Sequence, residues 1–507
     1  MIATTIDSDK SYFELEKLAT ELDGYVRTAV DLGRRQYDVE RDVLSQALRI
    51  GKAAMDLYLQ LQGDGDLGPT VSTADGEELE RSPDPVARPL RTVFGEHTFD
   101  AYVYAPGPKQ KIVLRPIDAR LQLPAGKFSY LYEEFSQYFC VEQAFGTAAE
   151  RLEAVLGKNT SVDSLESISR RLGEQAEEFL DNLPVPPAAK EAELFVVTSD
   201  AKGVPLVKAD AERIPVFETR ERPGNRRMAT LGCVYSVDRH VRSAQDILEA
   251  LFREKRDDVP RAPRPEPQFK QMVARFTRTY DEGPEQIVVP GAIEAFSWVA
   301  IQVDQRRRPG QLVIRLMDGQ PSLWDTADCC LADVPPECQV DVLDIIHVAG
   351  YVWRAAKAFE SLQEHREAFV WGRLERILEG DAKGVVAGLR RMATIRGLSG
   401  IALREVHSVC RYFENNLHRM RYDEYLREGY PIATGVIEGA CRHLVKDRME
   451  RSGMRWALEG AQAMLNVRST IASSYWNEFN QFRMAAEQKR LHVHAALVHN
   501  GPPPVRV

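Results

Sequence analysis

The sequence predicts a mixed α/β protein, with an α/β core that is interrupted by an all-α insertion domain and preceded by a mostly helical N-terminal region with a small β element. Three observations support this prediction. Residues 188–349 alternate short apolar runs with helix-like segments, as strands and helices in succession do. Residues 350–430 have helical spacing and no strand pattern. Near the N-terminus, apolar side chains recur every three or four residues, at Leu15, Leu18, Leu22, Val26 and Val30.

Length and composition are those of a globular protein in water. The chain has 507 residues, enough for several domains, with 44% hydrophobic and 28% charged residues. We find no apolar run long enough to span a bilayer, and the first residues lack the pattern of a signal peptide. The seven cysteines show no CxxC spacing, which favours reduced thiols over a zinc site. We therefore expect a cytoplasmic protein with no membrane partner.

The charge balance limits the possible partners. The 75 acidic residues outnumber the 66 basic ones, which argues against a simple nucleic-acid coat protein. DNA affinity depends on local basic patches rather than on the total charge. Such patches occur at Arg306–Arg308, at Arg390–Arg391 and in the segment 442–455, although each could also be a solvated surface.

The N-terminal third divides into four predicted segments. Residues 1–62 have the spacing of two or three helices. Residues 63–86 are rich in Gly, Pro, Asp and Ser, which predicts a linker. The alternating pattern within 87–128 predicts the small β element. Residues 129–187 are helical and form the fourth segment.

The fourth segment contains a possible DNA-reading motif. One predicted helix ends at Gly157, and a second begins near Ser161–Val162 after a short polar turn. This outline is typical of a helix-turn-helix, whose second helix would bring Arg170 and Arg171 to a major groove. An ordinary helical hairpin explains the spacing nearly as well.

The core region places two acids where strands are expected to end. The buried run Leu194–Thr198 should end at Asp200, and the run 311–317 should deliver Asp318. Between them we expect residues 201–205 to turn the chain into a second short strand, followed by a polar loop at about 209–225, a third strand at 228–237 and an exposed charged connection at 253–268. A fifth strand, 340–343, should deliver Asp344. The core would occupy 188–349 and 431–490, with the all-helical insertion at 350–430 and a flexible tail at 491–507.

A third acid lies in the segment 431–454. Thr434 stands at a predicted N-cap, and the helix after it should stop near Ser452–Gly453. Glu438 falls in its first turns, and the basic side chains that follow are Arg442, Lys446 and Arg448. Together they suggest a carboxylate that holds a metal ion beside cations that hold phosphates. A salt-bridged surface helix would also explain the pattern.

Asp200, Asp318 and Glu438 share one chemical interpretation. Three hard oxygen ligands without His or Cys favour Mg²⁺ or Mn²⁺, and two such ions suit phosphoryl transfer. Acids on the first strand, on the fourth strand and on a late helix are the outline of an RNase H-like fold. Asp318–Gly319 could by itself be a common turn after a strand.

Roughly residues 87–480 closely resemble bacterial insertion-sequence DDE transposases of the Kra group. These belong to an assemblage with Mutator-like elements in which a helical domain interrupts the RNase H-like core. The segments that carry the resemblance are VVTSDAKGVP, RRMATLGCVYSVD, LMDGQPSLWD, LDIIHVAGYVWRAA, CRYFENNLHRMRYDEYL and GYPIATGVIEGACRHLVKDRMERSGMRWALEGAQAML. Where relatives often carry paired cysteines in the N-terminal β segment, this chain has AYVYAPGPKQKI, so a zinc ribbon is not expected.

The resemblance implies roles for individual residues. Asp200, Asp318 and Glu438 match the catalytic acids, which would bind two Mg²⁺ or Mn²⁺ ions. Asp344 and His347 match a C/D-x-x-H signature with Asp in place of Cys, and we expect them to support the site without binding metal. The residues expected to contact DNA are Lys202, Arg226, Arg227, Arg442, Lys446, Arg448, Arg170 and Arg171.

The expected function is DNA transposition. The N-terminal helical region would bind the terminal inverted repeats, and the core would cleave the DNA and join the freed 3′-OH to target DNA. Because two DNA ends are processed together, the resemblance implies a homodimer or larger oligomer on the DNA, at the nucleoid. A transposase-derived DNA-binding protein without cleavage and an RNase H-fold nuclease without strand transfer are the alternatives.

Overall fold

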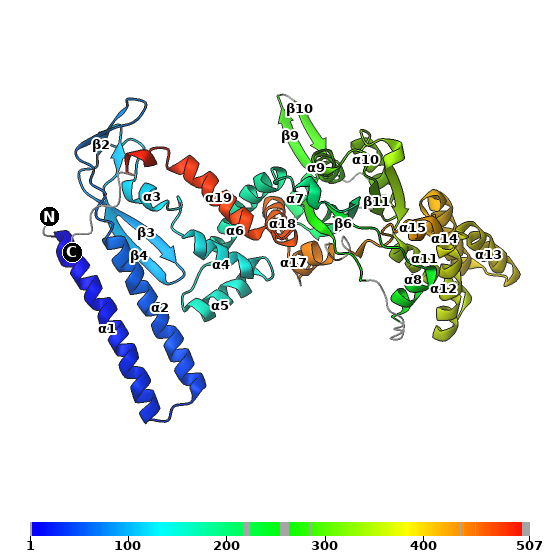
Figure 1. The fold of residues 1–507 in the computed structure, drawn as a ribbon, viewed down its shortest axis with the longest axis horizontal. Helices are drawn as coiled ribbons and strands as arrows, with labels where there is room; N and C mark the ends of the chain where they lie inside the picture. The colour runs from blue at the N-terminus through cyan, green and yellow to red at the C-terminus, as the bar shows by residue number, and fades with distance from the viewer. Residues whose placement is uncertain are drawn as a thin grey trace. The chain divides into compact units, whose positions relative to one another are not determined.

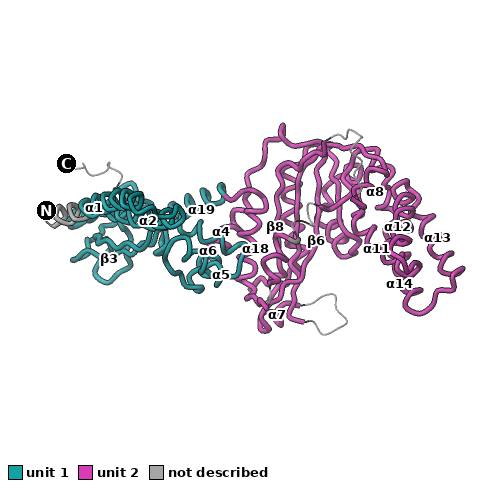
Figure 2. The backbone as a smooth tube through the Cα atoms, turned by 90° about the horizontal axis from the view of Figure 1, so that it is seen from below, with its two compact units in different colours: residues 1–171, 477–507 teal, residues 172–476 magenta. Residues whose placement is uncertain are grey.

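The computed structural model describes residues 3–215, 224–253, 263–283, 285–435, 439, 441–451 and 453–498. The chain divides into two compact units (Figure 2). Unit 1 comprises Met1–Arg171 and Asn477–Val507, and unit 2 comprises Leu172–Trp476. Glu438 lies outside the described residues. Among the described residues, we find no helix that combines the length and the apolar character needed to cross a bilayer.

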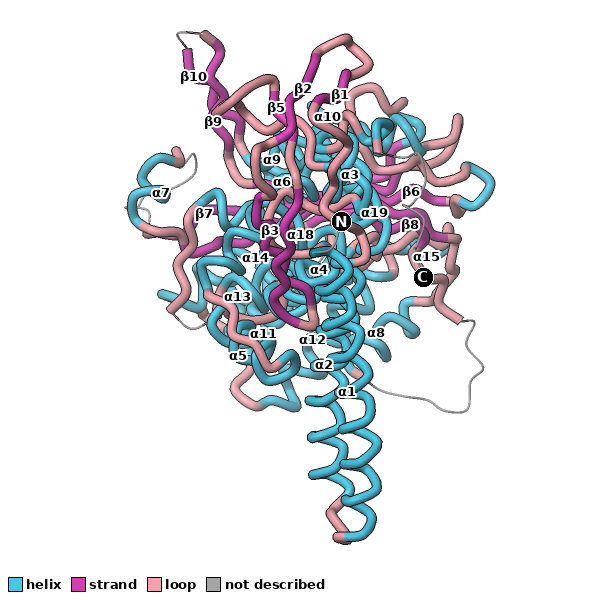
Figure 3. Tube along the Cα trace, turned by 90° about the vertical axis from the view of Figure 1, so that its left-hand side faces the viewer, coloured by secondary structure: helices cyan, strands magenta, loops and turns pink. Residues whose placement is uncertain are grey.

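Unit 1 begins with two long helices, α1 (Ala3–Asp31) and α2 (Gln36–Gln60), which lie side by side (Figures 1 and 3). The prediction of a linker at 63–86 is wrong. This segment contains β1 (Thr70–Ser72) and β2 (Glu78–Arg81), which form a sheet with β5 (Tyr104–Ala105). The reason is local burial, since Leu79 and Tyr104 pack together with no exposed surface despite the polar composition around them.

The predicted small β element is present. Strands β3 (Val86–Thr92) and β4 (Gly95–Ala101) form an antiparallel hairpin, and a short helix, α3 (Pro116–Leu121), follows β5. The alternation of buried and exposed residues along β4 is the period-two pattern of a strand with one buried face.

The helices of the predicted helix-turn-helix are also present. After α4 (Tyr130–Cys140), helix α5 (Phe145–Leu156) ends at Gly157, whose positive φ of 67° suits glycine. Helix α6 (Val162–Asp181) begins after Ser161. Its buried side includes Leu165 and Ile168.

The last described helix belongs to unit 1 and not to the core. The prediction extended the core to residue 490, but α19 (Trp476–Leu491) and the 3₁₀ turn η5 (Ala495–Leu497) are grouped with unit 1 from Asn477 onward. A buried ion pair explains this grouping. Arg483 Nη1 lies 2.9 Å from Glu133 Oε2 of α4, and both side chains are almost fully buried.

Unit 2 contains a five-stranded mixed sheet (Figure 1). The strand order is β12-β11-β6-β7-β8, in which β11 is parallel to both β6 and β12 and β7 is antiparallel to both β6 and β8. The strands are β6 (Leu194–Pro205), β7 (Arg226–Val237), β8 (Gln268–Arg275), β11 (Val313–Met317) and β12 (Gln339–Leu343). A separate hairpin is formed by β9 (Arg278–Glu282) and β10 (Glu285–Val289).

Two strand predictions were wrong. No separate second strand forms near 201–205, because β6 continues through Asp200 and pairs with β7 as far as Pro205. Strand β8 was not predicted; it begins at Gln268, the last residue of the expected exposed connection, whereas the strand predicted at 228–237 is present as β7. The strands at 313–317 and 339–343 agree with the prediction.

Helices pack against this sheet. Gly232 of β7 allows close approach of α9 (Gly291–Arg306), since a Cβ there would lie 3.1 Å from the Ala295 carbonyl oxygen. On β8, Arg275 Nη1 donates a 2.8 Å hydrogen bond to Asn466 of α18 (Leu458–Ala472). The shorter helical elements of this part of unit 2 are η1 (Ala188–Lys190), α7 (Lys208–Arg213), α8 (Ala244–Phe252), α10 (Pro321–Cys330) and η2 (Pro336–Cys338).

The predicted all-helical block is confirmed, since the residues from 350 to 430, all of them described, form helices and turns without a strand. Its elements are α11 (Ile345–Phe359), α12 (Gln363–Leu378), α13 (Ala382–Ile395), α14 (Gly400–Asn416), η3 (Leu417–Arg419) and α15 (Tyr422–Arg427). The single helix expected from Thr434 to about Ser452 is not what the described part shows. Residues Cys441–Lys446 form a π-helix, η4, and Asp447–Met449 form a short α-helix, α17. Such π segments are frequent at functional sites.

Candidate functional site

Asp200 of β6 and Asp318, which follows β11, lie at the same level of two neighbouring parallel strands. The register pairs Ile314 with Val196 and Arg315 with Val197, and three further residues along each chain lead to Asp318 and Asp200. Neighbouring strands are about 4.8 Å apart, and residues at one level of a parallel pair face the same side. The register therefore brings the two carboxylates to one place.

The two acids reach this place differently. Asp318 directly follows β11, as predicted, because that strand ends at Met317. Asp200 was expected to end its strand but lies within the twelve-residue β6, where it pairs with Leu231 of β7. Strand β11 ends beside the middle of β6. The second half of β6 therefore has no neighbouring strand among the described residues on the side where β11 lies.

Asp200 is paired with Lys202 two residues later on the same strand. Lys202 Nζ lies 2.9 Å from Asp200 Oδ2, and the side chains of the lysine and the aspartate are 43% and 18% exposed. Burial acts to lower the pKa of Lys202, but its hydrogen bond to Asp200 and the nearby Asp200, Cys441 and Asp318 groups raise that pKa overall. The ammonium group of Lys202 therefore lies in the field of both carboxylates.

The π-helix η4 contacts Asp200 through Cys441. The Cys441 thiol is buried and hydrogen bonds with Asp200. Burial raises the pKa of the thiol, and the charge of Asp200 raises it further. Cys441 follows Glu438 by three residues in the sequence. The chain thus contacts Asp200 at a residue that follows Glu438 closely in the sequence.

Asp344 joins the end of β11 to the segment that leads to η4. It is fully buried, caps the N-terminus of α11 by accepting a hydrogen bond from the Ile346 N–H, and donates its own N–H to the Met317 carbonyl at 2.9 Å. Its carboxylate also accepts from both the N–H and the hydroxyl of Thr434. Burial raises the pKa of Asp344, while the hydrogen bonds from Thr434 and Ile346 oppose that rise.

His347 lies one turn into α11. Its Nε2 is 4.0 Å from Asp344 Oδ2, and its side chain is 41% exposed. It lines the same cavity as Asp318. Asp344 thus organises the backbone between β11 and α11, and His347 lines the cavity; their supporting role stays a prediction.

A cavity of about 580 Å³ opens beside Asp318. Helix α14 forms one wall, where the Tyr412 ring stacks on Tyr351 at 3.7 Å between ring centroids. Gly319 is required here, because a Cβ at this position would clash with the Tyr412 ring. Sequence reasoning did not identify these tyrosines as site residues, and the aromatic side chains at helical spacing within the insertion were the available signal.

Besides Lys202, the predicted DNA-contacting residues comprise four with exposed side-chain surface, two that are buried, and Arg442. Lys446 and Arg170 are exposed, Arg226 is 58% exposed and forms an ion pair with Glu450, and Arg171 forms an ion pair with the buried Glu133. These four remain compatible with a surface role. The side chain of Arg442 lies outside the described part.

Arg227 and Arg448 do not fit the prediction. Arg227 is buried and donates to the carbonyl groups of Ala211, Ile214 and Gly224, so it holds together the chain around β7. Arg448 has no exposed surface, and its guanidinium lies 4.7 Å from the centre of the Trp456 ring. A buried cation that packs on an aromatic ring stabilises the fold and cannot reach a phosphate on the surface.

We compared the chain with known proteins. No protein-family model matches it, and no curated protein matches it. Among the residues that the structure describes, we find no cluster of three or more His, Cys, Asp and Glu side chains suited to a metal ion. The described residues therefore supply a pair of carboxylates, Asp200 and Asp318, with Lys202 and Cys441 beside them.

Proposed function

We propose that the protein is a DDE-type DNA transposase that binds the terminal inverted repeats of a mobile element, cleaves them and transfers the freed strand. The observation that supports this most strongly is the convergence of Asp200 and Asp318 on adjacent parallel strands, with the segment after Glu438 in contact with Asp200 through Cys441. Three acids from distant parts of the chain would then act together.

The sheet topology supports the same proposal. An RNase H-like core has three antiparallel strands in sequence, followed by two strands that extend the sheet on the other side of the first. The order β12-β11-β6-β7-β8 has this arrangement, with β6 in the centre. The helical block α11–α15 lies between β12 and η4, where an insertion into such a core is expected.

The carboxylates suit divalent ions. Oxygen-only ligands favour Mg²⁺ or Mn²⁺, and Asp200, Asp318 and Glu438 would hold two ions. When bound, these ions stabilise the attacking and leaving oxygens of a phosphodiester. Lys202 neutralises Asp200 in the described structure, and it would be displaced toward a neighbouring phosphate when a cation takes its place.

The reaction would proceed in two steps on DNA that the basic residues hold. In the first step, water attacks a phosphodiester, and the bond to the departing 3′-oxygen breaks to leave a 3′-OH and a 5′-phosphate. In the second step, that 3′-OH attacks a target phosphodiester and releases a new 3′-OH. Lys446 is exposed on η4 and would contact backbone phosphates. Acting on two DNA ends implies a dimer or larger oligomer.

The test is a cleavage and joining assay with purified protein, Mg²⁺ and a labelled linear DNA that carries both element ends. We expect nicked or excised products and joined products, and we expect Asp318→Asn to bind this DNA without cutting it. Asp304→Asn is the matched control, because Asp304 is exposed on α9 and outside the candidate site. Undiminished cutting by Asp318→Asn would remove this acid from the site. Cutting without joining would identify a nuclease, and binding without cutting would identify a transposase-derived DNA-binding protein.

A further inference from the structure

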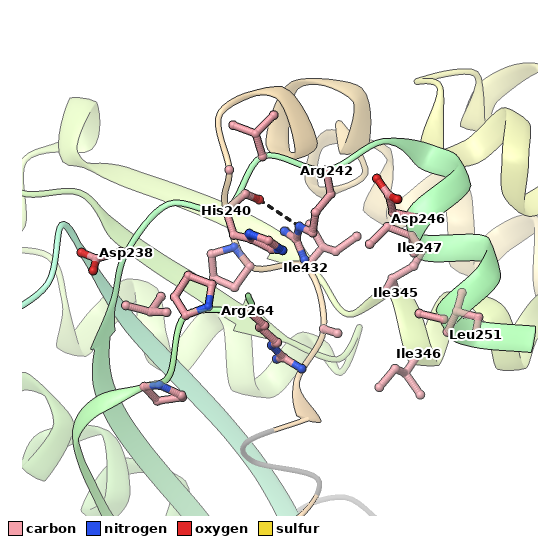
Figure 4. A pocket seen from close by; sticks show the side chains of 18 of the residues that line it. Asp238, His240, Arg242, Asp246, Ile247, Leu251, Arg264, Ile345, Ile346 and Ile432 are labelled. Atoms are coloured by element: carbon pink, nitrogen blue, oxygen red, sulfur yellow. Dashed lines mark hydrogen bonds between the residues drawn. The ribbon is translucent and has the colours of Figure 1, made fainter. Parts of the chain in front are cut away.

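A second cavity in unit 2 has a volume of about 700 Å³ and lies between the end of β7, helix α8 and the chain at 429–433 (Figure 4). Its size is typical of small-molecule pockets, which span about 300–1,000 Å³. Asp200 and Asp318 do not line it. It therefore calls for a separate explanation.

Basic side chains share this cavity. Figure 4 shows His240 and Arg242 side by side, with Arg264 near them. Arg242 Nε donates a 3.0 Å hydrogen bond to the His240 carbonyl, and Nη2 donates to the Tyr430 carbonyl. These bonds fix the guanidinium in position and leave its Nη1 without a hydrogen bond to another described residue. Arg264 forms neither a hydrogen bond nor an ion pair with the described residues.

Next to Arg242, the positive charge of Arg264 has a larger effect than the negative charge of Asp246. Burial lowers the pKa of Arg242 to about 10, and the charge of Arg264 acts in the same direction more strongly than Asp246 opposes it. Burial and the charge of Arg242 also lower the pKa of His240. An anion in the cavity would relieve this unfavourable electrostatic environment.

The two carboxylates that line the cavity have other partners. Asp238 accepts a hydrogen bond from the Glu193 N–H at 3.2 Å. Asp246 accepts from the N–H and the hydroxyl of Ser243 and so caps the N-terminus of α8. The charge of Asp246 also acts on Arg242, but less strongly than the charge of Arg264 does.

The rest of the wall is apolar. Ile247 and Leu251 of α8 face Ile345 and Ile346 at the start of α11, and Ile432 completes this side (Figure 4). A ligand that fills the cavity therefore needs an anionic group for the arginines and an apolar body for the isoleucines. Guanidinium groups favour phosphate, with which they form paired, charge-assisted hydrogen bonds.

We infer that this cavity binds a small phosphorylated molecule with an apolar body, of the size of a nucleoside monophosphate. The ligand would contact Ile345 and Ile432, whose backbones are joined by a 2.9 Å hydrogen bond from Ile345 N–H to the Ile432 carbonyl. Asp344 and Thr434, which are joined by their own hydrogen bonds, lie one and two residues away. A ligand bound in the cavity would thus stabilise the contact between residues 344–345 and residues 432–434, the segment that leads to η4. This inference goes beyond the proposed function and does not require DNA cleavage.

Isothermal titration calorimetry with AMP, adenosine and inorganic phosphate tests this inference. EDTA is kept in the buffer so that metal-bridged binding at Asp200 and Asp318 cannot contribute. We expect saturable AMP binding that is tighter than binding of phosphate or adenosine alone. Arg264→Glu should weaken AMP binding about tenfold or more, since it removes a charge-assisted hydrogen bond to the phosphate and adds a negative charge. Arg242→Gln should act in the same direction.

The matched control is Arg239→Gln, because Arg239 lies on the same segment but pairs with Glu193 and Glu428 outside the cavity lining. Its AMP affinity should equal that of the unmodified protein. Arg242 also donates hydrogen bonds to two carbonyl groups, so its substitution would disturb the local fold as well as ligand binding. Arg264 has no such contact with the described residues, and Arg264→Glu is therefore the variant that tests AMP binding. Hydrogen exchange supplies an independent readout, with slower exchange of the Thr434 amide when AMP is bound. Absence of saturable AMP binding, or AMP affinity unchanged in Arg264→Glu, would overturn the inference.

Discussion

The hydroxyl of Thr434 donates a hydrogen bond to the carboxylate of Asp344, a residue 90 positions earlier in the chain, and both side chains are buried. The bond spans the whole helical block between β12 and η4. Because Asp344 also binds the Met317 carbonyl through its N–H, this one residue connects the strand that delivers Asp318 with the segment that leads to Cys441.

Thr434→Val should destabilise unit 2. The substitution keeps the side-chain shape but removes one donor from a buried carboxylate, which costs about 1–3 kcal/mol. Urea denaturation measures the change in the free energy of unfolding. Thr394→Val is the control, because the Thr394 hydroxyl donates to the Arg390 carbonyl at an exposed position and its loss should cost little. Equal effects of the two substitutions would show that the bond to Asp344 is unimportant.

Asp344 should also make stability depend on pH. Burial raises its pKa in the folded protein above the ordinary value of 3.8, so the folded state binds this proton more tightly than the unfolded state does. The resulting stabilisation is complete below pH 3.8 and is lost as the pH rises through the folded pKa. As the pH rises above 3.8, the unmodified protein should lose this stabilisation and Asp344→Asn should not. The free energy of unfolding of Asp344→Asn should therefore increase relative to that of the unmodified protein. A difference that stays constant with pH would contradict this.

Gly319→Ala should destabilise the site next to Asp318. A Cβ at this position would clash with the Tyr412 ring, and overpacking of this kind costs about 1–3 kcal/mol. In a Tyr412→Ala background the same change should cost less, because the obstructing ring is gone. A double-mutant cycle in urea measures the coupling. Independent, additive effects would mean that the two residues do not compete for space.

Cys441 should be protected from thiol reagents in the folded protein. It is buried, and its raised pKa leaves little thiolate, whereas Cys329 is exposed. Mass spectrometry after brief maleimide treatment should find Cys329 modified and Cys441 unmodified. Labelling in urea should modify both, which controls for the reactivity of the peptides. Rapid native labelling of Cys441 would contradict its placement against Asp200.

Lys446 and Arg448 should affect DNA binding differently, although only one residue lies between them. Lys446→Met should weaken binding to all DNA sequences and reduce the slope of log affinity against log salt by about one, as loss of one phosphate contact does. Arg448→Met should lower the stability of the fold instead, because the buried Arg448 packs on Trp456. Fluorescence anisotropy across a salt series, combined with thermal unfolding, separates the two effects. A lower salt slope for a stably folded Arg448→Met protein would contradict the assignment.

Local patterns in the sequence were sufficient for many elements. The ends of α5 and α6 around Gly157 and Ser161, the short strand before Asp318 and the helical block after residue 350 follow from nearby residues alone. In each case the side-chain period, the cap or the glycine turn that defines the element lies within a few residues of it. The pairing of β6 with β11 could not be read in this way, because its register depends on strands more than a hundred residues apart.

The sequence by itself determined where helices and strands form and which acids and basic residues are candidates for a site. Only the tertiary structure decided that β6 runs through Asp200, that Cys441 lies against that carboxylate, and that Arg227 and Arg448 are buried. Helical and strand periods are set by neighbours in the chain. Burial and strand register are instead set by partners that folding brings from distant segments, so no local pattern encodes them.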